Sequence, residues 1–352
     1  MTKLKLISEI ANIDYSSLNT KLVETRSNIG VLKGACYGLP NPQLLLSPTM
    51  MREALESSEI ENIVTTLADA LQSQLFEENE QSPADKEVNR YHRALNAGLE
   101  QMNKSYLGTN TIIKIHDTLV PNEKGIKKTQ NKLVNKATGQ VVYEPVPPNL
   151  TQEYLSDLEK FINRKDNIDP VIKTILTHYQ FEKIHPFGDG NGRTGRILLV
   201  LCMIEFSLLD LPVLFISEYI NNHKQKYYKV FKEASDDGKY LEFVEYMLDA
   251  INSQAKESTD TLLGIKKLHE EAKRHIRAEL PKIYSRDLID AIFSQPLMTA
   301  TRYKEIMNVA YPTAQKHLRQ LEKIGFMKSA EVGKYRIYAN IELMKFLNKR
   351  DQ

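Results

Sequence analysis

The chain has 352 residues, of which 41% are hydrophobic and 26% charged, which is typical of a folded globular protein of two or three domains. A formal net charge of +2 at pH 7 is too small to indicate nucleic-acid or membrane binding by the whole chain, and no apolar run reaches the about 18 residues of a membrane span. Only Cys36 and Cys202 are present and the first residues lack a secretion signal, so we expect no disulfide framework and a cytoplasmic location.

The first 46 residues show no sustained periodicity. They alternate short apolar and polar pieces and end in Leu39-Pro40-Asn41-Pro42, whose prolines indicate irregular or extended backbone. Helical periodicity begins near Ser47, which is a suitable N-cap because Pro48 would then lie in the first turn. It breaks at Ser57-Ser58, where Ser58 and Glu61 have the spacing of a capping box at the start of a new helix.

Helical patterns dominate the next part of the chain. Apolar residues at helical spacing predict helices over residues 85–100, 111–120, 151–163 and 170–182. His116 lies in the second of these and is expected to be a core histidine rather than a ligand. Residues 132–143 differ, because two short apolar runs flank a turn at Gly139 and predict a β-hairpin.

Chemically useful groups are concentrated in the segment His185-Pro186-Phe187-Gly188-Asp189-Gly190-Asn191-Gly192-Arg193-Thr194-Gly195-Arg196. Its glycines allow the backbone to approach a ligand closely, and the apolar run 197–204 predicts a buried helix directly afterwards. The free amides at the start of that helix form an anion site. Arg193 and Arg196 share a face of its first turn, where cations oppose the helix dipole, so we expect an anion between them.

His185 and Asp189 supply the remaining chemistry of this segment. A histidine with an ordinary pKa near 6.5 can be neutral at pH 7 and accept a proton from a nucleophile. A carboxylate is a suitable ligand for a Mg²⁺ ion that also contacts substrate phosphates. The combination indicates nucleotidyl or phosphoryl transfer, whereas a loop that only caps a core helix would leave the two arginines unexplained.

The segment resembles the signature of the Fic (fido) family, H-P-F-x-[DE]-G-N-G-R-x-x-R, at every specified position. The resemblance implies a mainly α fold, with a helical core, a β-hairpin flap and a C-terminal winged helix-turn-helix domain. It also implies a protein adenylyltransferase, which moves AMP from ATP to a Ser, Thr or Tyr hydroxyl of a target protein. His185 would be the catalytic base and Asp189 would hold Mg²⁺.

The resemblance also implies a nucleotide site. Its residues would be Gly190, Asn191, Gly192, Arg193, Thr194, Gly195 and Arg196, together with Tyr228 near the adenine. Asn191 would orient the α-phosphate, and the two arginines would fix the β- and γ-phosphates.

A second interpretation of residues 57–62 follows from the resemblance. Ser57, Glu61 and Asn62 fit [ST]-x-x-x-E-[GN], the autoinhibitory motif that Fic proteins can carry. In such proteins the glutamate contacts the second signature arginine, here Arg196, and prevents productive placement of the γ-phosphate. Its position before the core resembles the subclass with an N-terminal inhibitory helix.

In the Fic family the hairpin at 132–143 would dock the target protein by backbone pairing, as in strand addition. The arginine–threonine region that usually precedes it reads Lys127-Lys128-Thr129 here, so this chain departs from the family at that contact.

The pattern changes again near residue 285. Helices are predicted over 288–293, 301–309 and 312–324, followed by a wing hairpin over 327–340 that turns at Gly333. Residues 285–352 carry a charge balance of +5, and the residues that could face a duplex are Gln315, Lys316, Arg319 and Lys323. A protein-interaction or dimerisation module fits this modest charge equally well.

These observations predict four parts: an N-terminal helical region with the inhibitory motif (1–105), a Fic core (106–251), a helical linker (252–284) and a winged helix-turn-helix domain (285–352). The expected partners are ATP, a target protein on the hairpin, the chain itself through auto-adenylylation or a homodimer, and DNA at the C-terminal domain, with no membrane. Three alternatives remain: the same fold removing AMP or using another phosphate donor, a DNA-binding regulator with a nucleotide-sensing core, and a dimeric scaffold.

Overall fold

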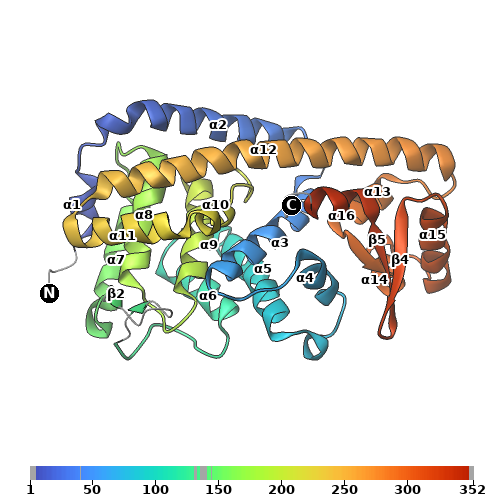
Figure 1. Cartoon of the computed structure of the whole chain (residues 1–352), viewed down its shortest axis with the longest axis horizontal. Helices are drawn as coiled ribbons and strands as arrows, with labels where there is room; N and C mark the ends of the chain where they lie inside the picture. Colours follow the sequence, from blue (N-terminus) through green and yellow to red (C-terminus); the bar gives the residue numbers. More distant parts are fainter. Residues whose placement is uncertain (1–4, 40, 131–132, 135–140, 144, 349–352) are drawn as a thin grey trace.

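The computed structural model describes residues 5–39, 41–130, 133–134, 141–143 and 145–348. This part of the chain is mostly helical, with one two-stranded and one three-stranded sheet, so the predicted mainly α class is confirmed. Helices α2 (Asn19–Tyr37) and α12 (Tyr240–Glu279) pack side by side along one edge of the molecule (Figure 1). Among the described helices, none has the length and apolar character needed to cross a bilayer.

Helices α1 (Ile7–Ala11) and α2 lie in the first 46 residues, a part of the predicted N-terminal helical region for which the sequence indicated no individual helix bounds. A 3₁₀ turn, η1 (Ser16–Leu18), connects them. The buried residues of α2 follow a three- and four-residue spacing and are Leu22, Thr25, Ile29, Leu32 and Cys36. This stripe is narrow and includes a threonine and a cysteine, so the apolar signal in the sequence is weak. Helix α2 is therefore stabilised mainly by packing against α12, although its own sequence gives only a weak helical signal.

Helix α3 (Pro42–Ile60) also differs from the prediction. It begins at Pro42, with Asn41 as the N-cap residue, so that Pro48 lies inside the helix instead of in its first turn. The helix continues through the serine pair, and the Ser58 hydroxyl donates to the Ala54 carbonyl at 2.7 Å, one turn back. The capping-box interpretation is therefore wrong, because Glu61 is the residue that ends a helix rather than one that begins it.

Two buried helices, α8 (Pro170–Ile184) and α9 (Asn191–Glu205), form the centre of the molecule. They are enclosed by helices that include α5 (Pro83–Met102), α6 (Thr109–Leu119), α7 (Pro148–Asn163) and α12. The predicted helices in this region are confirmed to within a few residues. The shorter elements nearby are α4 (Leu67–Ser73), η2 (Glu78–Glu80), α10 (Ser217–Asn222) and α11 (Lys224–Asp237).

The two strands of the predicted hairpin are present. Strand β1 (Leu133–Val134) pairs antiparallel with β2 (Val141–Tyr143), with Leu133 opposite Tyr143. The turn expected at Gly139 lies outside the described residues.

Helix α12 is continuous, so the predicted junction at residue 252 lies within it. Beyond it, four helices and an antiparallel sheet of strand order β3-β5-β4 form a module at the end of the molecule away from α7 and α8 (Figure 1). The predicted helices and wing hairpin of this module are present, whereas β3 and the last helix were not predicted. Its elements are α13 (Arg286–Ser294), β3 (Leu297–Thr299), α14 (Ala300–Met307), α15 (Tyr311–Lys323), β4 (Met327–Val332), β5 (Tyr335–Asn340) and α16 (Ile341–Asn348).

The close packing of α5 on α6 and α9 yields a test of the core. A Cβ added at Gly98 would lie 2.7 Å from Leu201 Cδ1 and 3.0 Å from Ile115 Cγ1, so Gly98→Ala should destabilise the protein by about 1–3 kcal/mol through overpacking. The matched control is Gly34→Ala in α2, where nothing lies within 4 Å, and it should stabilise by about 0.5–1 kcal/mol. Urea unfolding followed by circular dichroism measures both, and equal midpoints for the two variants would contradict the packing described.

Candidate functional site

The signature loop connects α8 to α9 and is framed by two residues in the left-handed conformation. His185 ends α8 with φ 51° and ψ 61°, while its amide still donates to the Phe181 carbonyl at 3.0 Å. Gly190 precedes α9 with φ 72°, and a Cβ there would lie 2.7 Å from a methyl group of Val120. Glycine is therefore required at 190, and the unusual backbone of His185 turns the chain sharply at the end of a rigid helix.

Asn191 and His116 hold this loop from within the protein. The Asn191 amide accepts from the Phe187 N–H and donates to the Phe187 carbonyl, both at 2.9 Å. The His116 ring stacks on Phe187 with centroids 3.7 Å apart, and its Nε2 lies 3.2 Å from the Asp189 carbonyl. His116 is thus a buried core histidine, as expected. The role foreseen for Asn191 at the α-phosphate stays a prediction, and in this structure its side-chain amide bonds the Phe187 backbone.

His185 has the properties of a neutral base. Burial and the neighbouring Lys127 ammonium together lower the pKa of His185 to about 4. Its imidazole is therefore neutral throughout the physiological pH range and can accept a proton. The Lys127 amide donates to the Pro186 carbonyl at 2.9 Å, so the segment that leads to the hairpin is anchored beside this histidine.

Arg196 is buried, and the end of α3 supplies its partners. Its Nε donates to the Ser57 hydroxyl at 2.8 Å, and its Nη2 donates to the Ser57 carbonyl at 2.7 Å and to Glu61 Oε1 at 3.0 Å. Burial alone would lower the pKa of Arg196, but the neighbouring acidic groups, Glu61 first among them, together raise it. Ser57 and Glu61 are four residues apart, so one face of α3 presents both to the same guanidinium.

The Glu61 carboxylate lies directly over the first turn of α9. A Cβ built at Gly192 would collide with Glu61 Oε1, so the absence of a side chain at 192 is what lets the carboxylate approach. The N-terminus of a helix attracts anions, and here the chain's own carboxylate occupies that position. The Glu61 side chain is still 35% exposed, which leaves it room to turn away.

The backbone conformation of Asn62 explains why the motif ends in glycine or asparagine. It has φ 65°, and its amide donates to the Glu59 carbonyl at 2.8 Å as the helix ends. Glycine and asparagine are the residues that adopt this left-handed conformation most readily after a helix. Asn62 therefore sets the exit of the chain from α3 through its backbone.

Arg193 is more deeply enclosed than the sequence suggested. Its Nη1 lies 2.5 Å from Glu87 Oε2 of α5, its Nη2 lies 3.5 Å from Asp189 Oδ2, and its side chain is only 2% exposed. Glu87 was not predicted as part of the site, because it lies far from Arg193 in the sequence and the folding of α5 against α9 brings the two together.

Asp189 is the exposed carboxylate of the loop. Its side chain is 68% exposed, and its Oδ1 accepts from the Gly190 amide at 2.6 Å, which fixes the carboxylate toward solvent. No group of three or more His, Cys, Asp or Glu side chains that could hold a metal was found in the described part of the chain. One exposed carboxylate fits a Mg²⁺ that takes its remaining ligands from waters and substrate phosphates.

The other predicted residues differ in their access to this space. Thr194 is fully buried and its amide donates to Gly190 O at 2.9 Å, so its expected contact with phosphate is not supported by its position. Tyr228 is partly buried, and burial followed by the nearby Glu61 charge raises its pKa to about 12. Tyr228 is therefore close enough to Glu61 for that charge to act on its hydroxyl, and its role at the adenine stays a prediction.

Residues behind the site were missed by the sequence analysis. His178 Nδ1 lies 3.1 Å from the Gly195 carbonyl and its Nε2 lies 3.1 Å from the Tyr227 hydroxyl. Burial lowers the pKa of His178 to about 4, so the neutral ring donates from Nδ1 and accepts at Nε2. The Glu182 carboxyl group fills the space that a side chain at position 195 would need, and burial raises the pKa of Glu182 to about 7. These groups position the first turn of α9.

Three family models match successive parts of the chain. Residues 19–100 match the Fic/DOC family N-terminal model, residues 106–203 match the Fic/DOC family model, and residues 268–343 match the C-terminal domain of SoFic-like protein adenylyltransferases. The signature loop lies within the second match and the Glu61 motif within the first.

Curated relatives match over shorter stretches. The chain is 30% identical over 131 residues to protein adenylyltransferase fic-1 of Caenorhabditis elegans, which covers 36% of this chain and 25% of the relative. It is 34% identical over 94 residues to a probable protein adenylyltransferase of Aquifex aeolicus, which covers 27% of each. The chain thus matches about a quarter of the length of these relatives.

Solved structures share the fold over most of the chain. A Fic family protein of Desulfovibrio desulfuricans matches with a TM-score of 0.56 at 20% identity, covering 91% of this chain and 95% of that one. A segment of Fic-1 from C. elegans matches with a TM-score of 0.53 at 22% identity, covering 71% of this chain and 74% of that one. With the complete signature, the family matches and the shared fold together, the chain belongs to the Fic/DOC family.

Proposed function

We propose that this chain is a protein adenylyltransferase that moves AMP from ATP to a hydroxyl of a protein target, and that Glu61 inhibits it. The observation that supports this most directly is the Glu61 carboxylate at the first turn of α9, bonded to Arg196. A negatively charged group held at a helix N-terminus by a buried arginine marks a site built for an anion. The relatives named protein adenylyltransferase support the choice of reaction.

In the proposed complex the phosphates of ATP lie over Gly190, Gly192 and the amides that open α9. Arg196 binds the terminal phosphates after Glu61 turns away. Hydrogen bonds between charged groups contribute about 1.5–3 kcal/mol each, so ATP must compensate for the lost Arg196–Glu61 bond. Tyr228, whose pKa responds to the Glu61 charge, would contact the nucleoside.

The reaction transfers one proton and one nucleotidyl group. A target hydroxyl loses its proton to the neutral His185 imidazole while its oxygen attacks the α-phosphorus of ATP. The bond from the α-phosphorus to the bridging oxygen breaks, and pyrophosphate leaves. The helix amides and Arg196 stabilise the charge that develops on the phosphate oxygens, commonly the largest contribution to such catalysis. Mg²⁺ bound at Asp189 would neutralise further phosphate charge.

The position and the free edges of the hairpin favour it as the docking site for the target protein. The segment before β1 is tied to the signature loop through the Lys127 amide and the Pro186 carbonyl, 2.9 Å apart. Strands β1 and β2 pair only with each other among the described strands, so backbone edges remain for an extended peptide. A hydroxyl side chain on such a peptide would then approach His185.

His185→Ala should reduce adenylylation by a factor of about 10²–10⁴, because the variant lacks the base that takes the hydroxyl proton. Nucleotide binding should be nearly unchanged, since the phosphates contact other groups. Self-adenylylation measured with labelled ATP gives the rate, and isothermal titration gives the affinity. The matched control is the exposed His223→Ala, which should keep the original rate. A His185 variant as fast as its control would contradict the assignment.

Glu61→Gly should raise the rate of self-adenylylation about ten- to a hundredfold, because ATP no longer competes with a bond of about 1.5–3 kcal/mol at Arg196. Intact-mass spectrometry after incubation with ATP and Mg²⁺ follows the added AMP. Glu59→Gly is the matched control, since Glu59 is an exposed carboxylate near the end of the same helix. The inhibitory role is excluded if the rate stays flat, or if both variants gain equally.

A further inference from the structure

Helix α15 presents cations on the side opposite its core contacts. Ala314, Leu318 and Leu321 are buried in the C-terminal module. The exposed face instead carries cations at a spacing of three and four residues, and none of them forms an ion pair with any described residue; they are Lys316, Arg319 and Lys323. Together with Pro312 and Gln315 they line an open hollow on the surface.

The acidic residue of the same helix is turned away from this face. Glu322 accepts from the Ser329 amide at 3.0 Å and from its hydroxyl at 2.5 Å, and lies 3.4 Å from Arg336. Its charge is therefore neutralised by the hairpin β4–β5. What remains on the open side of α15 is positive and polar, a composition unlike the apolar and aromatic centre of a protein interface, from which lysine is depleted.

The geometry of α14 and α15 matches the dimensions of duplex DNA. A three-residue turn, 308–310, joins the two helices, and Asn308 in it has φ 49°. Helix-turn-helix proteins place the second helix of such a pair in the major groove. Lys316 and Lys323 are separated by about 10 Å along the helix, and the groove is about 12 Å wide. Figure 1 places α15 at the far end of the molecule, clear of the Fic core.

We propose that the face of α15 formed by Lys316, Arg319 and Lys323 binds duplex DNA. The three cations contact backbone phosphates, and Gln315 and Tyr311 at the start of the helix face the base edges. The residues of this face take no part in the proposed adenylyl transfer.

The test is fluorescence anisotropy of a labelled 30-base-pair duplex with the full chain, at several salt concentrations. Each phosphate contact should contribute a slope of about −0.9 in log affinity against log salt, or roughly eightfold in affinity at 0.1 M. We expect single alanine variants at the three cations to reduce the affinity by up to that factor and flatten the slope by about one. The control is Lys345→Ala, an exposed lysine of α16 that is paired with Glu342.

Equal affinity for the triple variant and the original chain would overturn the proposal, as would binding independent of salt. Light scattering without DNA tests whether a second copy of the chain binds this face instead. If the original chain dimerises, the triple variant does not, and neither binds the duplex, α15 is a protein interface and the proposal is wrong.

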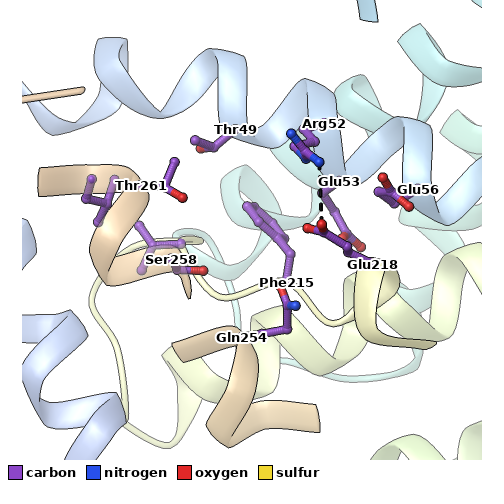
Figure 2. Close-up of a pocket in the computed structure, with 11 residues that line it drawn as sticks. Thr49, Arg52, Glu53, Glu56, Phe215, Glu218, Gln254, Ser258 and Thr261 are labelled. Carbon is purple, nitrogen blue, oxygen red and sulfur yellow. Dashed lines mark hydrogen bonds and ion pairs between the residues drawn. The ribbon is translucent and has the colours of Figure 1, made fainter. Parts of the chain in front are cut away.

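A second set of contacts connects the same module to the inhibitory helix. Arg52 of α3 donates from Nη1 to the Leu347 carbonyl of α16 at 2.8 Å, and its Nη2 lies 3.4 Å from Glu218 of α10. Figure 2 shows Arg52 and Glu218 beside Glu53 and Glu56, at the edge of a cavity of about 50 Å³. That volume admits a few waters and is far too small for a nucleotide, so this junction is structural.

The wing hairpin contacts the chain that follows the inhibitory motif. Lys334 lies 2.8 Å from Glu80, and the Tyr335 hydroxyl donates to the same carboxylate at 3.0 Å. The Tyr335 ring stacks on Phe76, with centroids 4.9 Å apart. The C-terminal module therefore contacts the chain on both sides of Glu61 in the sequence, at Arg52 and at residues 76–80.

We infer that these contacts form a clasp that holds α3 in the position where Glu61 reaches Arg196. The clasp rests on the contacts alone, whereas its effect on activity also rests on the proposed inhibitory role of Glu61. A partner that moves the C-terminal module would loosen α3 and thereby release the site.

Tyr335→Ala removes both the stacking and the hydroxyl contact, and Ile306→Ala, at an exposed residue of the same module, is its control. Hydrogen exchange of residues 50–62 in the full chain should become several-fold faster in the first variant and remain unchanged in the second. Glu80→Gln, which weakens the same contact, should show a smaller effect in the same direction, and this holds even if Tyr335→Ala folds poorly. Unchanged exchange in both clasp variants overturns the inference. Faster exchange without a gain in self-adenylylation supports the clasp and instead contradicts the inhibitory role of Glu61.

Discussion

The site depends on a buried guanidinium that must always have an anionic or polar partner. Arg196 is the sixth residue of α9, near the N-terminal end where the helix dipole disfavours a cation, and its side chain is almost completely enclosed. A buried charge without compensation costs several kcal/mol, so the protein has to supply a partner or a ligand has to replace it. Ser57 and Glu61 are that partner, so the position of α3 and the state of the proposed nucleotide site depend on one interaction.

The same constraint explains why the loop is so rigid. Both ends of the loop adopt left-handed conformations, and Asn191 and His116 hold it from the inside. The proposed function requires this loop to hold a base, a carboxylate and a row of amides around one phosphate chain, and a shift of about 1 Å can cost about 10²-fold in rate. The polar side chains buried beneath it therefore serve as positioning groups.

The sequence predicted the chemistry better than the packing. The signature residues and the Ser57–Glu61 spacing could be recognised because they are local patterns with a direct chemical meaning. Helix α2 could not, because its buried stripe is narrow and contains Thr25 and Cys36. Glu87 beside Arg193, and the clasp from Tyr335 to Phe76, join residues far apart in the chain. No periodicity or spacing in one sequence indicates such pairs.

A crystal structure of the Glu61→Gly variant with Mg²⁺ and a non-hydrolysable ATP analogue would test the central claim most directly. We expect phosphate oxygens within hydrogen-bonding distance of the amides that open α9 and of the Arg196 guanidinium, with the α-phosphorus facing His185. A nucleotide bound elsewhere, while Arg196 remains bonded only to Ser57 and no density lies over Gly192, would contradict the account.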